Sequence, residues 1–380
     1  MKNLILISLL AVLLYACGGG SSSSSSPTIV ETPVVTPVTY STMREATEAK
    51  SGIYVGSLYN DSYMQHDTNS SIYQEALSSN FNMMSLEWSI AMEEIWTNEN
   101  TIDFTRHDVA FDYARTNNMA VRVTHLLWYS TIPSWLENGV YTNAEVETLI
   151  EWYITQVITH YKANYPDVYT EWNVVNETIT DTSPSNLRNG FLVNKLGSDY
   201  IAKAFQWADA ADNTAKLYIV DYGCLGAGSV NNAKSTKLLS IMNDLVSRGI
   251  HIDGIGFQGH FSLSEYDNIE EIKTDFAQFA TLNLELQFTE LDILINNDVT
   301  GTSATKEEAQ ATFFKDIYQL CVDTPQCTAV SLWGLADHLS YVNTGWAPWL
   351  SQTEDWPLLI DENMQMKDVY DELVDILSTQ

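Results

Sequence analysis

Short apolar, β-prone runs alternate with longer segments of helical periodicity from Gly52 towards the C-terminus. The short runs favour buried strands, and apolar residues at three- and four-residue spacing favour amphipathic helices. We expect strands at residues 52–59, 81–88, 119–128, 169–177, 216–222, 252–261, 284–293 and 328–337. The clearest helical patterns cover residues 144–162, 233–249 and 306–322. The second pattern ends at a glycine and the third begins with an acidic turn, as helices commonly do.

Eight strand–helix units in one chain predict an α/β protein with a single (β/α)8 TIM barrel. A doubly wound open sheet is the alternative, and it would more often carry a glycine-rich phosphate loop after its first strand. Gly52 and Gly56 do not form such a loop, and the sequence contains no Walker motif. The pattern therefore favours the barrel.

The first residues have the composition of an export signal and not of a folded domain. Lys2 precedes an apolar run over residues 4–14, which is too short to span a membrane comfortably. We therefore expect a signal peptide at residues 1–16.

The end of this signal resembles a bacterial lipobox, in which a cysteine is lipidated and becomes the mature N-terminus. Leu14 and Cys17 fit this pattern, whereas Tyr15 replaces the usual small residue. Gly18 stands where a lipoprotein of the inner membrane often carries Asp. We expect Cys17 to anchor an exported lipoprotein in the outer membrane of a Gram-negative bacterium, at the cell surface.

Residues 17–41 are rich in Gly, Ser and Pro and have too little apolar surface to form a core. We expect them to form a disordered tether. The folded domain then covers residues 42–380 and is expected to be monomeric.

The chain is strongly acidic, with a formal charge of −31. This charge argues against nucleic acid and anionic lipid headgroups as partners. Eleven Trp, 20 Tyr and 12 Phe can fill a core and still leave aromatic rings for a ligand surface. The acidic residues are most simply explained as a solvated protein surface. This acidity is compatible with an uncharged substrate.

Four cysteines remain to be placed, of which Cys17 is expected to carry lipid. Cys321 and Cys327 flank a turn-like spacer, and a short-loop disulfide there suits an exported protein. Cys224 is then expected to be buried and reduced. Because the sequence shows no CxxC, HExxH or clustered His and Cys, we expect no catalytic metal.

Polar side chains gather where the expected strands end, which is the functional face of a barrel. One such residue is usually a helix cap or a turn residue, but seven strand ends together are hard to explain by capping. The strand-end residues are Glu87, Trp88, His125, Trp128, Asn176, Glu177, Asp221, Tyr222, Gln258, His260, Glu290, Asp292, Trp333 and Asp337.

Glycoside hydrolysis is the chemistry that suits this set. It needs two carboxyl groups on either side of the bond to be cleaved, about 5–5.5 Å apart when configuration is retained. Carboxylates from the fourth and seventh strands could face each other over a bound sugar. Trp at the rim would hold sugar rings, and an imidazole would keep one carboxylate ionised and oriented.

Several segments resemble motifs of glycoside hydrolase family 10. WNVVNE at 172–177 resembles the acid/base motif of the family, and FTELDI at 288–293 resembles its nucleophile motif. GIGFQGHF, LWGLADHLSYV, RVTHLLWYSTIPSW and WPLLIDENM resemble four further motifs, in the family's order. The spacing of Cys321 and Cys327 also recurs in the family. The resemblance runs from about Gly52 to the C-terminus.

The resemblance implies a retaining endo-β-1,4-xylanase on a (β/α)8 barrel, without a cofactor. It implies that Glu177 is the general acid/base and Glu290 the nucleophile, supported by Asn176, Gln258 and His260. Asn176 would bind the 2-hydroxyl of the sugar being cleaved, and Gln258 and His260 would lie beside the nucleophile. The implied substrate-binding residues are Glu87, Trp88, Trp128, Tyr222, Trp333 and Tyr341.

The sequence departs from the family mainly where the family holds sugars on the glycone side of the cleaved bond. Family Lys, His, Gln and Asn residues are replaced by Ala91, Thr124, Thr131, Val220 and Gly223. His125 lies next to Thr124, but strand alternation predicts that, unless a bulge intervenes, it points away from the face shared by Thr124 and Trp128. Trp88 replaces an Asn and Tyr341 a Trp.

These departures predict an altered glycone pocket, in which an unpaired polar group costs about 1–3 kcal/mol. Loop residues such as Trp88, His66 or Gln65 could compensate. The leading hypothesis is cleavage of β-1,4-xylan. The alternatives are a retaining glycosidase for a decorated or mixed-linkage xylan or another β-glycan, and a non-catalytic glycan-binding lipoprotein.

Overall fold

The computed structural model describes residues 39–50, 52–87, 91–296, 302–345 and 354–379. The expected signal peptide, Cys17 and nearly all of the expected tether lie outside these ranges. A compact unit runs from Tyr40 to Gln380, so it begins two residues before the expected domain boundary.

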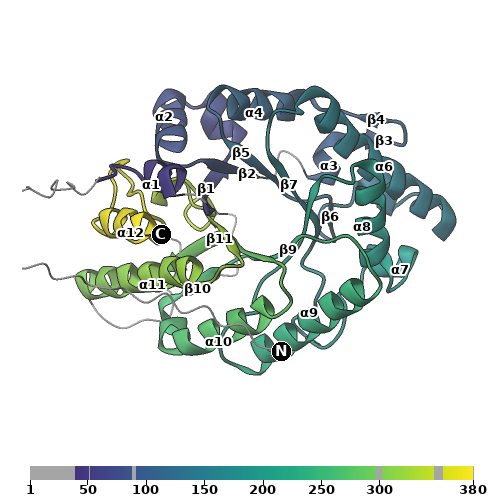
Figure 1. Ribbon diagram of the computed structural model, residues 1–380. Helices are drawn as coiled ribbons and strands as arrows, with labels where there is room; N and C mark the ends of the chain where they lie inside the picture. The colour runs from purple at the N-terminus through teal and green to yellow at the C-terminus, as the bar shows by residue number, and fades with distance from the viewer. Residues whose placement is uncertain (1–38, 51, 88–90, 297–301, 346–353, 380) are drawn as a thin grey trace, which may run out of the picture. The chain divides into compact units, whose positions relative to one another are not determined.

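Eight parallel strands close into a barrel in this unit, which confirms the predicted (β/α)8 fold (Figure 1). Each strand pairs with its neighbour in the order β1-β2-β5-β7-β8-β9-β11-β12, and β12 pairs with β1 to close the ring. The barrel strands are β1 (Tyr54–Tyr59), β2 (Met83–Leu86), β5 (Ala120–Val123), β7 (Thr170–Asn176), β8 (Lys216–Asp221), β9 (Gly254–Phe257), β11 (Glu285–Leu294) and β12 (Cys327–Leu332).

Two short strands extend the barrel at its carboxyl end. They are β6 (Leu127–Trp128), which pairs with β7, and β10 (His260–Ser262), which pairs with β11. The expected strands at 119–128 and 252–261 are therefore each interrupted. The second interruption contains Gly259, whose φ of +80° favours glycine because side chains rarely tolerate it.

Helices surround the strands (Figure 1). They are α1 (Met43–Lys50), α2 (Ser70–Asn80), α3 (Met92–Ile95), α4 (Thr105–Thr116), α5 (Ser134–Glu137), α6 (Asn143–Asn164), α7 (Phe191–Leu196), α8 (Tyr200–Ala211), α9 (Ser229–Ser247), α10 (Ile269–Ala280), α11 (Ser303–Asp323) and α12 (Val369–Ser378). The remaining elements are η1 (Ser62–His66), η3 (Leu263–Asn268), η4 (Asp337–Leu339) and the hairpin β3 (Trp96–Asn98) and β4 (Thr101–Ile102). No helix in the described ranges is both long and apolar enough to span a membrane.

The three predicted helices are α6, α9 and α11. Thr142 and Glu145 form a capping box at the start of α6, which satisfies two backbone N–H groups that the helix leaves open. Gly249 follows the end of α9 in the left-handed region, as expected. The acidic first turn predicted for α11 is wrong, because Thr302 caps the helix and Glu307 lies beyond its first turn.

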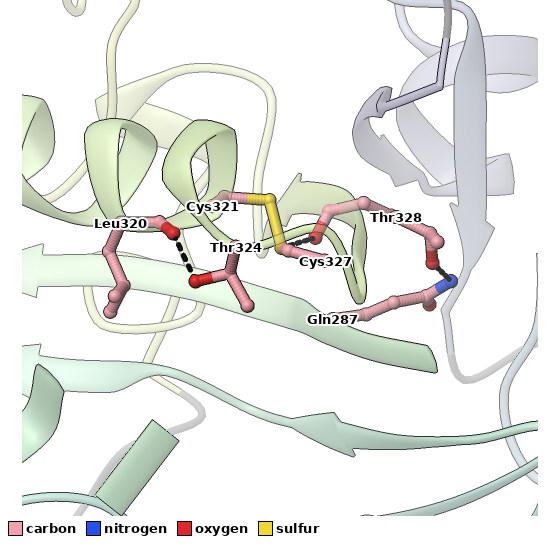
Figure 2. The surroundings of a disulfide bond; sticks show 7 residues. Gln287, Leu320, Cys321, Thr324, Cys327 and Thr328 are labelled. Carbon is pink, nitrogen blue, oxygen red and sulfur yellow. Dashed lines mark hydrogen bonds between the residues drawn. A yellow bond between two sulfur atoms is a disulfide. The ribbon is translucent and has the colours of Figure 1, made fainter. Parts of the chain in front are cut away.

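A disulfide joins Cys321 near the end of α11 to Cys327 at the start of β12, as expected (Figure 2). Between them, the Thr324 hydroxyl donates to the Leu320 carbonyl and the Cys327 N–H donates to the Thr324 carbonyl. The bond therefore fixes the connection from the last large helix to the strand that closes the barrel. Cys224 is buried and reduced.

We predict that the double replacement of Cys321 and Cys327 by Ser will lower the free energy of unfolding. The loss should be about 2 kcal/mol, because the bridge closes only a short loop of the unfolded chain. Urea unfolding followed by tryptophan fluorescence measures the change. A reducing agent should destabilise the native chain by a similar amount and leave the double variant unaffected; equal sensitivity of the two proteins would contradict the prediction.

Candidate active site

The carboxyl ends of the barrel strands bring the expected site residues to one rim. Trp128 lies opposite Asn176 in the β6–β7 pairing, and His260 lies opposite Asp292 in the β10–β11 pairing. Glu177 directly follows β7, and Trp333 directly follows β12. The strand topology therefore brings the ends of these strands together, as the sequence predicts.

Glu177 is held in an uncommon backbone conformation at the end of β7. Its φ is +54°, its N–H donates to the Val220 carbonyl at 2.9 Å, and its carbonyl accepts a bond of 3.0 Å from Nε of Arg188. A side chain in this left-handed region is rare away from functional or strained positions. Hydrogen bonds to the N–H and to the carbonyl of Glu177 thus fix its backbone and, with it, the direction of its side chain.

Burial raises the pKa of the Glu177 carboxyl to about 7. Bonds from Gln258 and from the Trp128 indole act in the opposite direction, while the carboxylates of Asp221 and Glu290 add to the rise. A carboxyl with such a pKa exchanges a proton near neutral pH, as a general acid/base must.

Gln258 contacts both Glu177 and Glu290, through different groups. Its Nε2 donates to Oε1 of Glu177 at 3.1 Å and to Oδ1 of Asn176 at 3.3 Å. Only its backbone carbonyl meets Glu290, from whose N–H it accepts a bond of 2.8 Å. Gln258 therefore lies beside the nucleophile, as expected, but through its backbone, whereas its side chain, which follows β9, bonds with Glu177 at the end of β7.

Glu290 lies within β11 and is 3% exposed. Nε2 of His260 is 3.3 Å from its Oε2, and Nδ1 of the same ring is 2.8 Å from Oδ2 of Asp292. Burial alone would lower the pKa of His260, but the Asp292 and Glu290 carboxylates outweigh it and raise the pKa to about 10. The imidazolium therefore bridges two carboxylates at neutral pH, as the expected contact between His260 and Glu290 requires.

Two aromatic residues complete this side of the site. The rings of Trp333 and His260 are 6.3 Å apart, and those of Tyr341 and His260 are 5.6 Å apart. Both aromatic side chains remain partly exposed. They place apolar ring surface beside Glu290, where a sugar ring could lie.

Glu87 follows β2 on the opposite side of the rim. Its Oε2 accepts a bond from Nδ2 of Asn60, and its pKa is raised by burial and, less strongly, by Asp61 and Glu290. Glu87 is therefore within the electrostatic reach of the site. Trp88, the next expected residue, lies outside the described residues.

Trp128 joins His125 in an aromatic pair with ring centroids 4.9 Å apart. The expectation that His125 points away from Trp128 is wrong, because β5 ends at Val123 and strand alternation does not extend to residue 125. His125 is half-buried as a residue, and burial lowers the pKa of its imidazole to about 3, so the ring is neutral.

Tyr222 is at the rim, but internal partners occupy its hydroxyl group. The hydroxyl donates to the Asp181 carboxylate and accepts a bond of 3.0 Å from Arg188. Nζ of Lys234 lies 3.5 Å from the centre of the Tyr222 ring and forms ion pairs with Asp181 and Asp221. Tyr222 is therefore placed to offer ring surface to a ligand more readily than its hydroxyl.

Sequence reasoning missed Arg188 and Tyr129, which both contact the Glu177 region. The Arg188 guanidinium lies 4.4 Å from the centre of the Tyr129 ring, and Glu177 is a hydrogen-bond partner of the Tyr129 hydroxyl. Tyr129 is 39% exposed. Its position directly after Trp128 was a usable signal, whereas Arg188 lies in a loop with no periodic pattern to single it out.

Two buried polar atoms of Asn176 and Glu290 have no hydrogen-bond partner among the described residues. They are Nδ2 of Asn176 and Oε1 of Glu290. Leaving such groups unpaired costs about 1–3 kcal/mol each, which a substrate hydroxyl or a reacting carbon could offset. The arrangement thus offers one titrating carboxyl, one carboxylate held by an imidazolium, an open amide donor and several aromatic faces.

Comparison with known proteins gives a family for this arrangement. The model of glycosyl hydrolase family 10 matches residues 42–376. Endo-1,4-beta-xylanase A from Thermoanaerobacterium saccharolyticum is 32% identical over 312 residues, which cover 80% of this chain and 25% of that protein. The chain therefore spans about a quarter of the length of this curated relative.

Two further relatives match over most of their own length. Beta-1,4-xylanase from Dictyoglomus thermophilum is 31% identical over 80% of this chain and 84% of that protein. The crystal structure of xylanase 10B from Thermotoga petrophila RKU-1, in complex with xylobiose, superposes with a TM-score of 0.79 at 27% identity. The superposition covers 90% of this chain and 98% of that structure.

Proposed function

The chain belongs to glycosyl hydrolase family 10, and we propose that it is a retaining endo-β-1,4-xylanase. One observation carries the proposal. Glu177 directly follows β7, Glu290 lies within β11, and Gln258 connects them by a side-chain bond to Glu177 and a backbone bond to Glu290. The names of the relatives above support xylan as the polymer.

Glu290 is proposed as the nucleophile. Its free Oε1 attacks the anomeric carbon, while Oε2 stays on His260. The bond between the anomeric carbon and the glycosidic oxygen breaks, and a covalent glycosyl-enzyme forms. The contact with His260 holds Oε2 in place and orients the carboxyl group for this attack.

Glu177 is proposed as the general acid/base. In the first step its carboxyl proton passes to the departing oxygen, and in the second step its carboxylate takes a proton from the attacking water. The raised pKa of Glu177 suits a group that must be protonated in one step and ionised in the next. Asn176 would donate its open Nδ2–H to the 2-hydroxyl of the reacting sugar.

The alkaline limb of the pH profile provides a test of this role. Because Glu177 must be protonated to act as an acid, kcat/KM is expected to fall as pH rises through about 7. Gln258→Met keeps the side-chain length but removes the bond that lowers the Glu177 pKa, so the fall should move to higher pH. Initial rates between about pH 5 and about pH 9 measure this shift. If Gln258→Met lowers the rate but the alkaline fall of kcat/KM stays at the same pH, the result would count against Glu177 as the titrating acid.

The glycone side of the cleft is proposed to differ from that of an ordinary xylanase. The replacement residues are buried and turned inward: Thr124 donates to the Leu86 carbonyl, and Thr131 donates to the Trp128 carbonyl at 3.3 Å. Val220 and Ala91 are buried and apolar. Gln65, a possible substitute, donates to the Tyr59 hydroxyl. These contacts support an altered glycone pocket, and a decorated or mixed-linkage xylan, or another β-glycan, is the alternative substrate.

Release of reducing sugar from a panel of polysaccharides tests the function. The panel contains linear β-1,4-xylan, glucuronoxylan, arabinoxylan, mixed-linkage β-1,3/1,4-xylan and β-glucan. Cleavage of any xylan, with loss of cleavage in Glu290→Ala, is the expected result. Cleavage of only the substituted or mixed-linkage polymers would support the altered glycone pocket. Binding without cleavage, unchanged in Glu177→Ala and Glu290→Ala, would instead identify a glycan-binding protein.

We also propose that the protein acts as a monomeric catalytic domain at the cell surface, exported and anchored by lipid on Cys17. The lipobox-like residues and the Gly/Ser/Pro-rich segment after them support this proposal. In a Gram-negative host, the native chain should incorporate labelled palmitate and fractionate with the outer membrane. Cys17→Ala should do neither. Equal membrane fractionation of both proteins would count against the anchor.

A further inference from the structure

A second cavity opens at the end of the barrel opposite Glu177 and Glu290. Its volume is about 310 Å³, which falls in the range of small-ligand sites. Its lining includes Tyr54, the first residue of β1, and Tyr169, which directly precedes β7. Eight residue steps separate Tyr169 from Glu177, or about 26 Å at the rise of an extended strand. The two sites are therefore separate.

Two stacked tyrosines form the aromatic part of this cavity. The rings of Tyr54 and Tyr169 are nearly parallel, at 13°, with centroids 5.2 Å apart. Tyr169 is nevertheless 39% exposed, and because Tyr54 covers one of its faces, the open area belongs to the rest of the ring. The Tyr169 hydroxyl donates to Oε1 of Glu171 at 3.1 Å, which holds the ring in place.

The charges around the cavity are paired. Arg115 binds Asp167 at 2.6 Å, and Arg44 binds Glu48 at 2.7 Å. Behind the tyrosines, Glu171 is bound to Arg122, and both are fully buried. Since each cation near the rim is matched by a carboxylate, the site suits an uncharged ligand. The net charge of −31 further disfavours an anionic one.

The rim also carries two asparagine side chains, of which one is open and the other is already bonded. Asn118 has a φ of +52°, and its carbonyl accepts a bond of 3.3 Å from Arg44. Its side-chain amide makes no hydrogen bond in the part of the chain that the structure describes. Asn82 is held from both ends, by the Val55 N–H at 2.9 Å and by the Thr47 hydroxyl at 3.1 Å. The rim therefore offers the open side-chain amide of Asn118 beside an Asn82 amide that internal bonds hold in place.

We propose that this cavity is a second glycan-binding site, which holds a segment of the neutral polysaccharide whose cleavage is proposed above. A sugar ring stacks on the open part of Tyr169, and its hydroxyls meet the Asn118 amide and the carboxylate of Asp167. The proposal rests on the proposed function for the identity of the polymer. Binding at this end keeps the enzyme on the polymer while the cleft engages another segment.

Xylohexaose binding to the Glu290→Gln variant tests the site, because this variant is expected to bind without turnover. Calorimetry should give two molecules of xylohexaose per chain. Tyr169→Ala in the same background should weaken the second binding event about tenfold or more, since it removes the stacking face. Tyr169→Phe keeps the ring and should retain both events.

Asn118→Gly is the matched variant for the polar rim. Glycine suits the positive φ, so the variant removes only the amide and should weaken the second event while the fold is kept. Tyr169→Ala and Asn118→Gly, made in the active enzyme, should both hydrolyse a short aryl β-xylobioside at the native rate. Loss of that hydrolysis would indicate a structural role for these residues and would overturn the proposal.

The outcomes separate this site from the proposed function. If one xylohexaose binds per chain and Tyr169→Ala does not change its affinity, the second site is overturned and the proposed xylanase function stands. If one xylohexaose binds per chain and Tyr169→Ala weakens that binding, the second site is supported and binding of xylan in the catalytic cleft is contradicted. Absence of any binding overturns the site as a xylan site.

Discussion

Replacing Glu290 with alanine will lower the turnover of the cleaved xylan by about 10⁴-fold or more, as expected when a covalent nucleophile is removed. The carboxylate has one open oxygen and one oxygen on His260, so no neighbouring residue in the described structure is placed in the same way. Initial rates of reducing-sugar release, with enzyme concentration raised for the variant, measure the loss.

Glu285→Gln is the matched control, because Glu285 begins the same strand at the far end of the barrel. It binds Lys216 at 2.7 Å and touches no residue of the cleft. Its loss should affect stability and leave turnover near native. An activated 2-fluoroxylobioside should label the peptide that contains Glu290, as seen by mass spectrometry. Labelling of another carboxylate, or near-native turnover in Glu290→Ala, would contradict the assignment.

Replacing Glu177 with alanine will lower xylan turnover by about 10²–10⁴-fold, the usual contribution of a positioned general acid. The loss should depend on the leaving group. A dinitrophenyl β-xylobioside needs little protonation, so formation of its glycosyl-enzyme should be much less impaired, and the intermediate should accumulate because the base is absent. Pre-steady-state release of dinitrophenol measures this difference.

Azide provides the control for Glu177→Ala. A small anion can enter the space left by the carboxylate and attack the glycosyl-enzyme without a base, so added azide should accelerate turnover of the dinitrophenyl substrate and yield a β-xylosyl azide. In Glu290→Ala no glycosyl-enzyme forms, so azide can only displace dinitrophenol directly, and any azide product of that variant should have the α configuration. An equal loss on xylan and on the dinitrophenyl substrate, with no azide response, would argue that Glu177 is structural.

The position of the strands could be predicted from the sequence because it depends on local pattern. The run expected at 169–177 became β7 at Thr170–Asn176, and the run at 216–222 became β8 at Lys216–Asp221. Buried strands of a parallel barrel are apolar on both faces, so they stand out as short continuous runs. The interruptions at residues 124–126 and 258–259 were not predicted, because they serve the geometry of the rim and leave the apolar pattern unchanged.

The contacts within the site depended on barrel closure. Gln258 was expected beside Glu290, and its side chain also bonds with Glu177, which is 81 residues away in sequence. Arg188 reached the site from a loop that shows no periodic signal, and it binds the Glu177 carbonyl. The stacked pair of Tyr54 and Tyr169 likewise joins residues far apart in the chain. Such pairings follow from strand order and register, which single-strand patterns do not encode.

The sequence by itself determined that this chain forms eight strand–helix units and that Glu177 and Glu290 end up near strand termini, because hydrophobic periodicity is a local property. Only the tertiary structure decided what those carboxyl groups touch. Burial raises the pKa of Glu177, and the His260 imidazolium bridges Glu290 and Asp292. Both effects require groups from distant segments to meet in a space from which water is largely excluded, and closure of the barrel creates that space.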